Sequence, residues 1–471
     1  MDYQSFAWSY SQGLSTVPPM PRTDGLAIAS LGAKATTPIP FALRGCVLTP
    51  ENSIENGYML ISQGQVVSVG TVRPPSDTPV IDTDGVIFPG LIDLHNHPEY
   101  NVFPAWEPPQ FYRDRYEWRQ SWIYQHVLAG PMNELRAAPS LERTLARYAE
   151  IRALVAGVTA IQGAGPNYPQ DGSLIRNIDL WVLGQQRARS AVDLPNQAVA
   201  DQIKKDIASG AVKAFYIHLA EGIDEKSKAE FETLKDLGLL IPETVIIHGT
   251  ALTHKQLIEI KGVGAKIVWS PQSNLRLYGS TTRAAEALEL GIPLGIGADW
   301  LPSGSTSLLQ EIKVARRVLA GQGRQISAKD LITMVTKSAA SIAGFGDMLG
   351  RLQPNSPADI LVVERRHSDP WENVVAANPS WVNLVLIGGQ PCYGIPGWFE
   401  TILPSATGQE LDSVVAWGKV MWLDLRKADP QPMSEVSRQS QPGDSPSGYS
   451  ALQDIRSLLI ARYPLVGPVF A

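Results

Sequence analysis

Apolar, strand-like runs alternate with amphipathic helical stretches from about residue 92 to residue 345. One strand-like run, FYIHLAEG, precedes the helical KSKAEFETLKDLG, and another, TVIIHGTAL, precedes HKQLIEIKGVG. Alternation sustained over about 250 residues predicts a parallel α/β fold, and at this length a (β/α)8 barrel. One barrel unit is not evident, because only a helix, AVADQIKKDIASG, can be placed between SLIRNIDLW and FYIHLAEG.

Short β-rich runs separated by turn residues lie on both sides of this region. FALRGCVLTP, GYMLISQGQVVSVG and PVIDTDGVIFPG predict a small antiparallel sheet before the barrel. GRLQPNSPADILVVE and WVNLVLIGGQPCYG resume the β pattern after it. We therefore expect residues 38–91 and 346–425 to form one small β domain, with the barrel at 92–345 inserted between them.

The two ends of the chain differ in composition from the segments between them. Residues 1–37 are rich in Gly, Pro, Ser and Thr and predict an N-terminal arm. Residues 426–471 begin as a polar Pro/Ser linker and end in a short amphipathic helix that we expect to dock back on the protein.

Composition narrows the choice of partners and compartment. The 471 residues carry a formal net charge of −6, so the sequence lacks the excess of positive charge that is typical of proteins binding nucleic acid or anionic lipid. No apolar run approaches the roughly 20 residues of a membrane span, and no secretory signal is evident at the N-terminus. The only cysteines, Cys46 and Cys392, suit a reducing compartment. We expect a cytoplasmic protein.

Four histidines and an aspartate end apolar, strand-like runs. His95 and His97 stand two apart in LIDLHNHP, so both side chains project from one side of a strand. His218 ends AFYIH, His248 ends TVIIH, and Asp299 ends PLGIGAD. Active sites of these barrels form at the C-terminal ends of the strands. Neutral imidazoles with one carboxylate suit Zn²⁺ or a similar divalent ion, with a position left for water.

Each of these features alone is weak. A single His-x-His is common, a lone histidine at a strand end is more often a core residue, and an aspartate after a Gly-rich strand is more often a helix cap. Together, in barrel order and all at strand ends, they indicate a metal site. Glu221 follows His218 by three residues and is the candidate for moving protons beside the metal.

The sequence resembles the amidohydrolase superfamily, and within it the branch of cytosine deaminase, guanine deaminase and chlorotriazine hydrolase. The resemblance covers roughly residues 40–390 and is carried in order by VIFPGLIDLHNHPEYN, GVTAIQG, FYIHLAEG, VIIHGTAL, WSPQSNLRLYG, GIGADW and GRLQPNSPADILVV. It implies a distorted (β/α)8 barrel with a small β-sandwich built from the two flanking segments. It also implies one metal ion bound by His95, His97, His218 and Asp299.

The resemblance further implies roles for the remaining candidates. His248 would contact the metal or orient the attacking water, Asp299 would accept the proton of that water, and Glu221 would shuttle protons to and from the substrate. Trp300 departs from the small or polar residue usual after the last-strand aspartate, and the loop after the first strand is unusually aromatic and charged.

Four residues are candidates for binding substrate. Gln162 ends the second strand, and Asn274 in SPQSNLRL ends the seventh, where a loop-stabilising turn is the alternative. Trp300 follows the last-strand aspartate. Arg119 belongs to the aromatic segment after the first strand, which could equally pack the top of the barrel.

The expected reaction is hydrolysis at a carbon–nitrogen bond other than a peptide bond, with a metal-activated water attacking a ring carbon and an amine leaving. Deamination of a small heterocyclic amine is the leading version. Hydrolysis of a cyclic amide or of another ring substituent is the first alternative, and an inactive barrel acting as a scaffold is the second. One divalent ion per subunit is expected, zinc before iron or manganese, and family habit favours a homo-oligomer.

Overall fold

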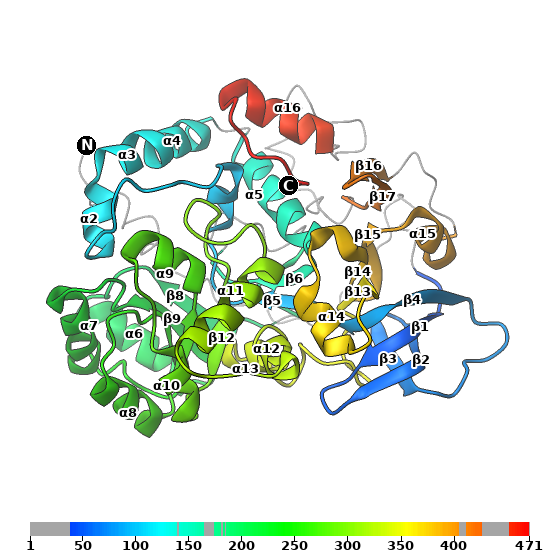
Figure 1. The fold of residues 1–471 in the computed structure, drawn as a ribbon, viewed down its shortest axis with the longest axis horizontal. Helices are drawn as coiled ribbons and strands as arrows, with labels where there is room; N and C mark the ends of the chain where they lie inside the picture. The colour runs from blue at the N-terminus through cyan, green and yellow to red at the C-terminus, as the bar shows by residue number, and fades with distance from the viewer. Residues whose placement is uncertain are drawn as a thin grey trace, which may run out of the picture.

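The computed structural model describes residues 38–138, 141–163, 174–179, 182–183, 185–404, 411–425 and 452–470 (Figure 1). The predicted N-terminal arm, residues 1–37, and the predicted linker up to residue 451 lie outside the described residues.

Eight short strands, each parallel to the neighbours it pairs with, form the centre of the molecule. Three of them pair in the order β5-β6-β7 and five in the order β12-β11-β10-β9-β8. Their bounds are β5 Leu91–Asp93, β6 Val158–Ile161, β7 Arg176–Asn177, β8 Ala188–Ala191, β9 Ala214–Leu219, β10 Thr244–His248, β11 Lys266–Trp269 and β12 Leu294–Ile296. β7 and β8 are the unit that the sequence pattern did not reveal.

The first and last strands meet and join the two sheets into a barrel. The Leu94 amide donates to the Ile296 carbonyl at 3.5 Å, and the Asp299 amide donates to the His95 carbonyl at 2.9 Å. Gly297 permits this approach, because a Cβ there would lie 2.6 Å from the His95 Cβ. β7 and β8 show no pairing among the described residues, which makes the barrel distorted.

Helices follow the strands, as the alternating pattern predicts. They are α5 Leu141–Val155, α6 Gln197–Ala208, α7 Glu225–Asp236, α8 His254–Val263, α9 Pro271–Tyr278, α10 Ala284–Glu289, α11 Leu308–Gly321, α12 Ala328–Thr333 and α13 Lys337–Ile342. Side-chain caps fix where several of them begin: Asp224 accepts from the Ser227 amide, and Thr253 forms a capping box with Gln256.

The connection from β5 to β6 is long, and it carries additional helical turns. We call residues 98–136 the first-strand loop. It contains η1 Pro98–Val102, α2 Arg115–Gln120, α3 Trp122–Tyr124, the π-helical η2 Gln125–Ala129 and α4 Gly130–Arg136. Figure 1 shows these turns on the side of the barrel that also carries α9.

Segments from both sides of the barrel build one nine-stranded sheet. Its order is β16-β17-β15-β14-β13-β4-β1-β2-β3. The strands are β1 Phe41–Leu48, β2 Ser53–Ser62, β3 Gln65–Gly70, β4 Val80–Pro89, β13 Ile360–Glu364, β14 Val382–Ile387, β15 Gln390–Gly394, β16 Asp412–Ala416 and β17 Lys419–Leu423. β13 pairs antiparallel with β4 and joins the flanks.

The expectation of an antiparallel N-terminal sheet is wrong at one pair. β1 and β2 are antiparallel, as are β2 and β3, but β1 and β4 run parallel. β3 finishes at the end of the sheet where β1 also finishes, and residues 71–79 carry the chain back to the end where β1 begins, so β4 runs in the direction of β1. The division of the chain into domains stays a prediction.

The rest of the chain packs around these two parts. α14 Pro370–Ala376, η3 Pro379–Trp381 and α15 Pro396–Ile402 accompany the nine-stranded sheet, and α16 Leu452–Arg462 lies against α5 (Figure 1). Tyr148 and Arg152 of α5 donate to the carbonyls of Gly467 and Pro468, which follow α16. Within the described part of the chain, every helix is too short or too polar to cross a bilayer.

Candidate metal centre

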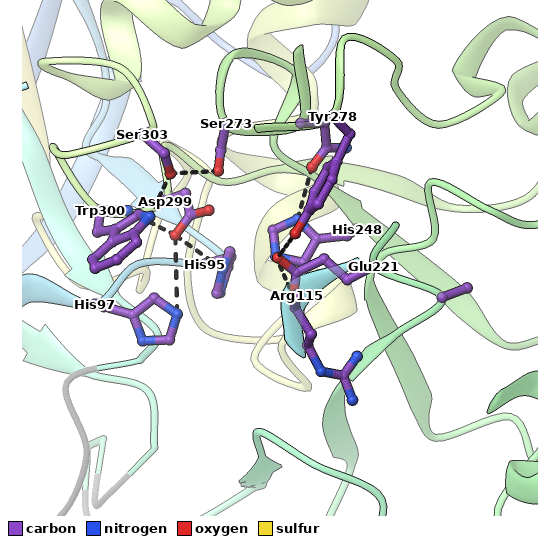
Figure 2. Close-up of polar contacts among 12 residues, drawn as sticks. His95, His97, Arg115, Glu221, His248, Ser273, Tyr278, Asp299, Trp300 and Ser303 are labelled. Carbon is purple, nitrogen blue, oxygen red and sulfur yellow. Dashed lines mark hydrogen bonds and ion pairs between the residues drawn. The ribbon is translucent and has the colours of Figure 1, made fainter. Parts of the chain in front are cut away.

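The C-terminal ends of four barrel strands bring the five predicted ligand candidates together. His95 and His97 follow β5, His218 lies in β9, His248 ends β10, and Asp299 follows β12. One ligand atom from each of His95, His97 and His218 lies within 4.8 Å of the others, and the same holds for His95, His248 and Asp299. Figure 2 shows Asp299 facing His95 and His97. The two groups share His95 and so form one cluster.

The strand ends leave regular β geometry where they carry these side chains. Ala220, His248 and Asp299 have φ values of 53°, 67° and 58°, in the left-handed region that side chains rarely adopt. Hydrogen bonds hold two of them: Thr282 Oγ1 donates to the His248 carbonyl at 2.5 Å, and the Asp299 amide donates to the His95 carbonyl. Backbone strain of this kind is typical of functional sites.

Asp299 is a buried carboxylate surrounded by imidazoles. Its Oδ1 lies 3.3 Å from His95 Nε2 and 3.9 Å from His97 Nε2. Burial alone would raise the pKa of Asp299, but the imidazoles of His95, His248 and His97 lower it well below its usual range. Burial likewise opposes the charging of His95, yet Asp299 and its other acidic neighbours raise the pKa of His95.

The other imidazoles are neutral at physiological pH. Burial and the neighbouring His95 lower the pKa of His97 to about 3, and the same two causes lower the pKa of His218 well below its usual value. Burial also lowers the pKa of His248. A neutral imidazole offers a nitrogen lone pair, which is the form that binds a metal ion.

Several buried polar atoms of the cluster make no hydrogen bond. Both ring nitrogens of His95 and Nδ1 of His218 are buried without a hydrogen-bond partner among the residues that the structure describes. Buried polar groups are rarely left in this state, because the loss of hydration is costly. Unpartnered imidazole nitrogens beside a carboxylate fit a bound divalent cation, so the residues present fit the metal that the motifs imply.

The hydrogen-bond network assigns the tautomer of His248. Asn274 Nδ2 donates to the hydroxyl oxygens of Thr281 and Thr282 at 3.2 and 3.3 Å, which leaves Oδ1 to face His248 Nδ1 at 2.9 Å. An amide oxygen only accepts, so His248 Nδ1 carries the proton. Nε2 therefore presents its lone pair toward the cluster.

Glu221 lies beside the histidines, two residues after β9. Its Oε2 is 3.7 Å from His248 Nε2 and has no hydrogen-bond partner within the described part of the chain, whereas Oε1 accepts from the Tyr278 hydroxyl at 2.6 Å (Figure 2). Its side chain is only 4% exposed. A carboxyl group at this place can exchange a proton with a molecule bound at the cluster.

Asp93 accepts hydrogen bonds from the backbone beside the candidate ligands, and the sequence analysis did not single it out. Its Oδ1 accepts from the amides of His95 and Ala298 at 3.3 and 3.0 Å, and its Oδ2 accepts from Asn96 Nδ2 at 2.9 Å. Burial raises the pKa of Asp93 to about 6. Its place two residues before His95, in LIDLHNHP, was the available signal.

Two of the candidates for binding substrate lie near the cluster. Gln162, which donates to Asp179 at 3.0 Å, lines a pocket together with His95, His97 and His218. Trp300 packs its ring 6.3 Å from the His97 ring.

The other two differ from expectation or lie apart. Asn274 does not end a strand, because β11 stops at Trp269 and Pro271 starts α9, so Asn274 contacts His248 from a helix. The Arg119 guanidinium pairs with Asp193 at 3.3 Å and lies over the Trp118 ring. The positive charge of Arg119 nevertheless helps to lower the pKa of His97, a member of the cluster.

Comparisons with known proteins agree with this geometry. The model of the Amidohydrolase family matches residues 194–392, a segment that contains His218, Glu221, His248 and Asp299. The 5-methylthioadenosine/S-adenosylhomocysteine deaminase of Teredinibacter turnerae is 29% identical over 165 residues, which are 33% of this chain and 37% of that protein. The enzyme of the same name from Desulforamulus reducens is 24% identical over 72% of this chain and 89% of its own length.

Solved structures share the fold. An adenosine deaminase from Xanthomonas campestris with bound zinc matches with a TM-score of 0.61 and 19% identity, over 75% of this chain and 93% of that one. The atrazine chlorohydrolase of Arthrobacter aurescens TC1, complexed with zinc, matches with a TM-score of 0.61 and 18% identity, over 74% and 94%. The (β/α)8 barrel fold class is confirmed.

These matches also confirm the resemblance to the amidohydrolase superfamily that the motifs indicated. The class that it implied, a hydrolase, is confirmed with it.

Proposed function

We propose that this protein is a metal-dependent hydrolase that deaminates a heterocyclic amine. The observation that carries the proposal is the pair of three-residue groups, His95/His97/His218 and His95/His248/Asp299, which share His95, with Glu221 beside them. A general acid next to a metal cluster suits the departure of an amine, which must leave with a proton. The relatives named as deaminases of adenosine-type compounds support this reading.

In the proposed site, His95, His97, His218 and Asp299 hold one divalent ion. When bound, the ion would supply a water whose pKa is lowered to roughly 7. His248 presents the Nε2 lone pair toward the same point, so it either completes the ligand set or orients that water. Zinc is the proposed ion, with iron or manganese as alternatives, because neutral nitrogen ligands and one carboxylate suit it and solved relatives hold zinc.

The side chains then divide the proton transfers. Asp299, which its imidazole neighbours keep ionised, accepts a proton from the attacking water. Glu221, which enters this step protonated, would deliver its proton through Oε2 to the nitrogen that leaves, and the proton taken up by Asp299 would return to Glu221 through solvent before the next turnover. The substrate ring would occupy the pocket beside Gln162. Trp300, whose ring packs beside His97, would contact the substrate from the side of His97.

A panel of amines tests this function. Purified protein loaded with zinc is incubated with 5′-methylthioadenosine, S-adenosylhomocysteine, 5′-deoxyadenosine, adenosine, guanine and cytosine, and released ammonia is measured. We expect ammonia from at least one compound, and none from Glu221→Gln. Ammonia from none of them would contradict the deaminase proposal.

A second hydrolytic function is favoured by one observation, the structural match to a chlorohydrolase. Release of chloride from atrazine without ammonia from the amines would select that alternative, and hydrolysis of dihydrouracil would select a cyclic amidase. A protein that binds no metal and turns over none of these compounds would be the inactive scaffold.

The setting of the reaction is part of the proposal. We propose a small-molecule substrate and a cytoplasmic location without nucleic-acid or membrane partners, supported by the net charge of −6 and by a content of only two cysteines. A homo-oligomer is proposed by family analogy alone.

A further inference from the structure

A chain of three buried side chains runs from the first-strand loop to the metal centre. Trp118 of α2 donates its indole N–H to the Tyr278 hydroxyl at 2.8 Å, and that hydroxyl donates to Glu221 Oε1 at 2.6 Å. The three residues are 6%, 2% and 3% exposed. Water therefore does not compete for these hydrogen bonds.

The direction of both hydrogen bonds is fixed by chemistry. An indole N–H can only donate, so the Tyr278 oxygen is the acceptor from Trp118. The single Tyr278 proton is then left for Glu221 Oε1, to which the hydroxyl donates. Oε1 is occupied as an acceptor, while Oε2 lies unpartnered 3.7 Å from His248 Nε2. The hydrogen bonds from Trp118 through Tyr278 therefore make the two carboxyl oxygens of Glu221 different: Oε1 is bonded and Oε2 faces His248.

The first-strand loop is anchored to the strand end that carries Glu221. The Arg115 amide donates to the Glu221 carbonyl at 3.2 Å, and the Ile223 amide donates to the Arg113 carbonyl at 2.7 Å. A Cβ at Gly222 would lie 2.5 Å from the Arg113 carbonyl oxygen, so this contact needs glycine.

An ion pair fixes the same helix. The fully buried Arg115 guanidinium bonds Glu230 Oε2 at 3.0 Å, and that oxygen also accepts from the Ala220 amide at 2.8 Å. Figure 2 shows Arg115 beside Glu221. α2 and the turn that carries Glu221 are therefore held as one unit, which fixes Trp118 relative to the carboxyl group.

We propose that Tyr278 is a positioning residue that holds Glu221 with Oε2 facing the reacting molecule, and that Trp118 acts through Tyr278 by fixing the direction of its hydroxyl. This inference rests on the proposed function for its kinetic consequence only. It makes the unusual first-strand loop a part of the active site, because α2 supplies the outer member of the chain.

Three variants and one control test this proposal in the zinc-loaded protein. Tyr278→Phe keeps the ring and removes the hydroxyl; we expect kcat for the best amine of the panel to fall roughly 10- to 100-fold with KM changed less than about 2-fold. Trp118→Phe should lower kcat roughly 3- to 10-fold. Tyr112→Phe is the matched control, since the buried Tyr112 hydroxyl has no hydrogen-bond partner among the described residues. The Tyr112 amide donates to the Leu277 carbonyl of α9, the helix that also carries Tyr278.

The double variant shows whether Trp118 and Tyr278 act in series on Glu221 or independently of each other. If Trp118 acts only through the Tyr278 hydroxyl, adding Trp118→Phe to Tyr278→Phe produces no further loss of kcat. Multiplied losses would overturn the role of Trp118, and a kcat of Tyr278→Phe equal to that of the wild type would overturn the role of Tyr278. Unchanged zinc content and melting temperature exclude a general loss of structure.

A crystal structure of Tyr278→Phe gives a readout that needs no turnover. We expect the Glu221 carboxyl group to leave its wild-type orientation or to occupy more than one. A carboxyl group that keeps one orientation in this variant would overturn the inference even if the wild type deaminates none of the amines. Wild-type inactivity on the panel, by contrast, would contradict only the proposed function.

Discussion

Glu150 should make the free energy of unfolding depend on pH, and this effect can be measured independently of the metal centre. This residue of α5 is 2% exposed; Oε1 accepts from the Leu174 amide at 2.8 Å, and Oε2 accepts from Arg147 Nη1 at 2.8 Å. Burial raises the pKa of Glu150 from 4.5 to about 7, and the nearby Arg147 only partly offsets this cost. Glu150→Gln keeps an acceptor oxygen at the site and removes the titration.

The sign and size of the effect follow from linkage. A raised folded-state pKa means that the folded protein holds the proton more tightly, so the contribution is fully present below pH 4.5 and is lost as the pH rises through about 7. With 1.36 kcal/mol per pKa unit, the wild type should lose about 2.5 kcal/mol of unfolding free energy between pH 5 and pH 8 because of this group.

Chemical unfolding at the two pH values measures this difference. We expect the wild-type stability, relative to Glu150→Gln, to fall by about 2.5 kcal/mol from pH 5 to pH 8. Glu134→Gln, the same change at an exposed glutamate, is the control for the substitution itself. A difference between wild type and Glu150→Gln that stays constant or grows in favour of the wild type with pH would refute the reasoning.

Three further substitutions test the centre. Glu221→Gln should lower ammonia release at least about 100-fold while the bound metal is retained, and loss of the metal would contradict its role as a proton carrier. Asp299→Ala should lose both metal and activity, since a ligand and a proton acceptor disappear together; metal analysis with an activity assay checks both. Gly297→Ala should destabilise by about 1–3 kcal/mol and weaken metal binding, because the new Cβ meets His95; Gly321→Ala, with open space around it, is the control in thermal unfolding.

The barrel could be predicted where its strands are apolar and its helices amphipathic. β9 and β10, followed by α7 and α8, lie where the pattern placed them. β8 was missed because ARSA has no strong strand former, and β7 because it is two residues long. The parallel β1–β4 pair was beyond prediction, since strand direction depends on the order in which strands join the sheet.

The candidate site could be predicted where its polar side chains follow directly on apolar strands. The four histidines, Glu221 and Asp299 could be singled out for that reason, and the structure places them together. Asp93 and Tyr278 were missed because they act on other side chains rather than at the cavity. Which residues contact one another in this way depends on the three-dimensional fold, and a local sequence pattern does not reveal it.

The same limit explains two other residues. Asn274 was assigned to a strand end, but the proline two residues after β11 starts a helix there. Arg119 was a candidate for the pocket, yet Asp193, 74 positions away in the sequence, pairs with its guanidinium.

The central claim, that side chains from four strand ends hold one divalent ion, is tested most directly by metal analysis after dialysis against zinc. We predict about one zinc ion per chain for the wild type and for His254→Ala, which changes an exposed histidine outside the cluster. His95→Ala and His218→Ala should retain less than about a tenth of that amount. A wild-type protein without zinc, or full binding in both cluster variants, would contradict the account.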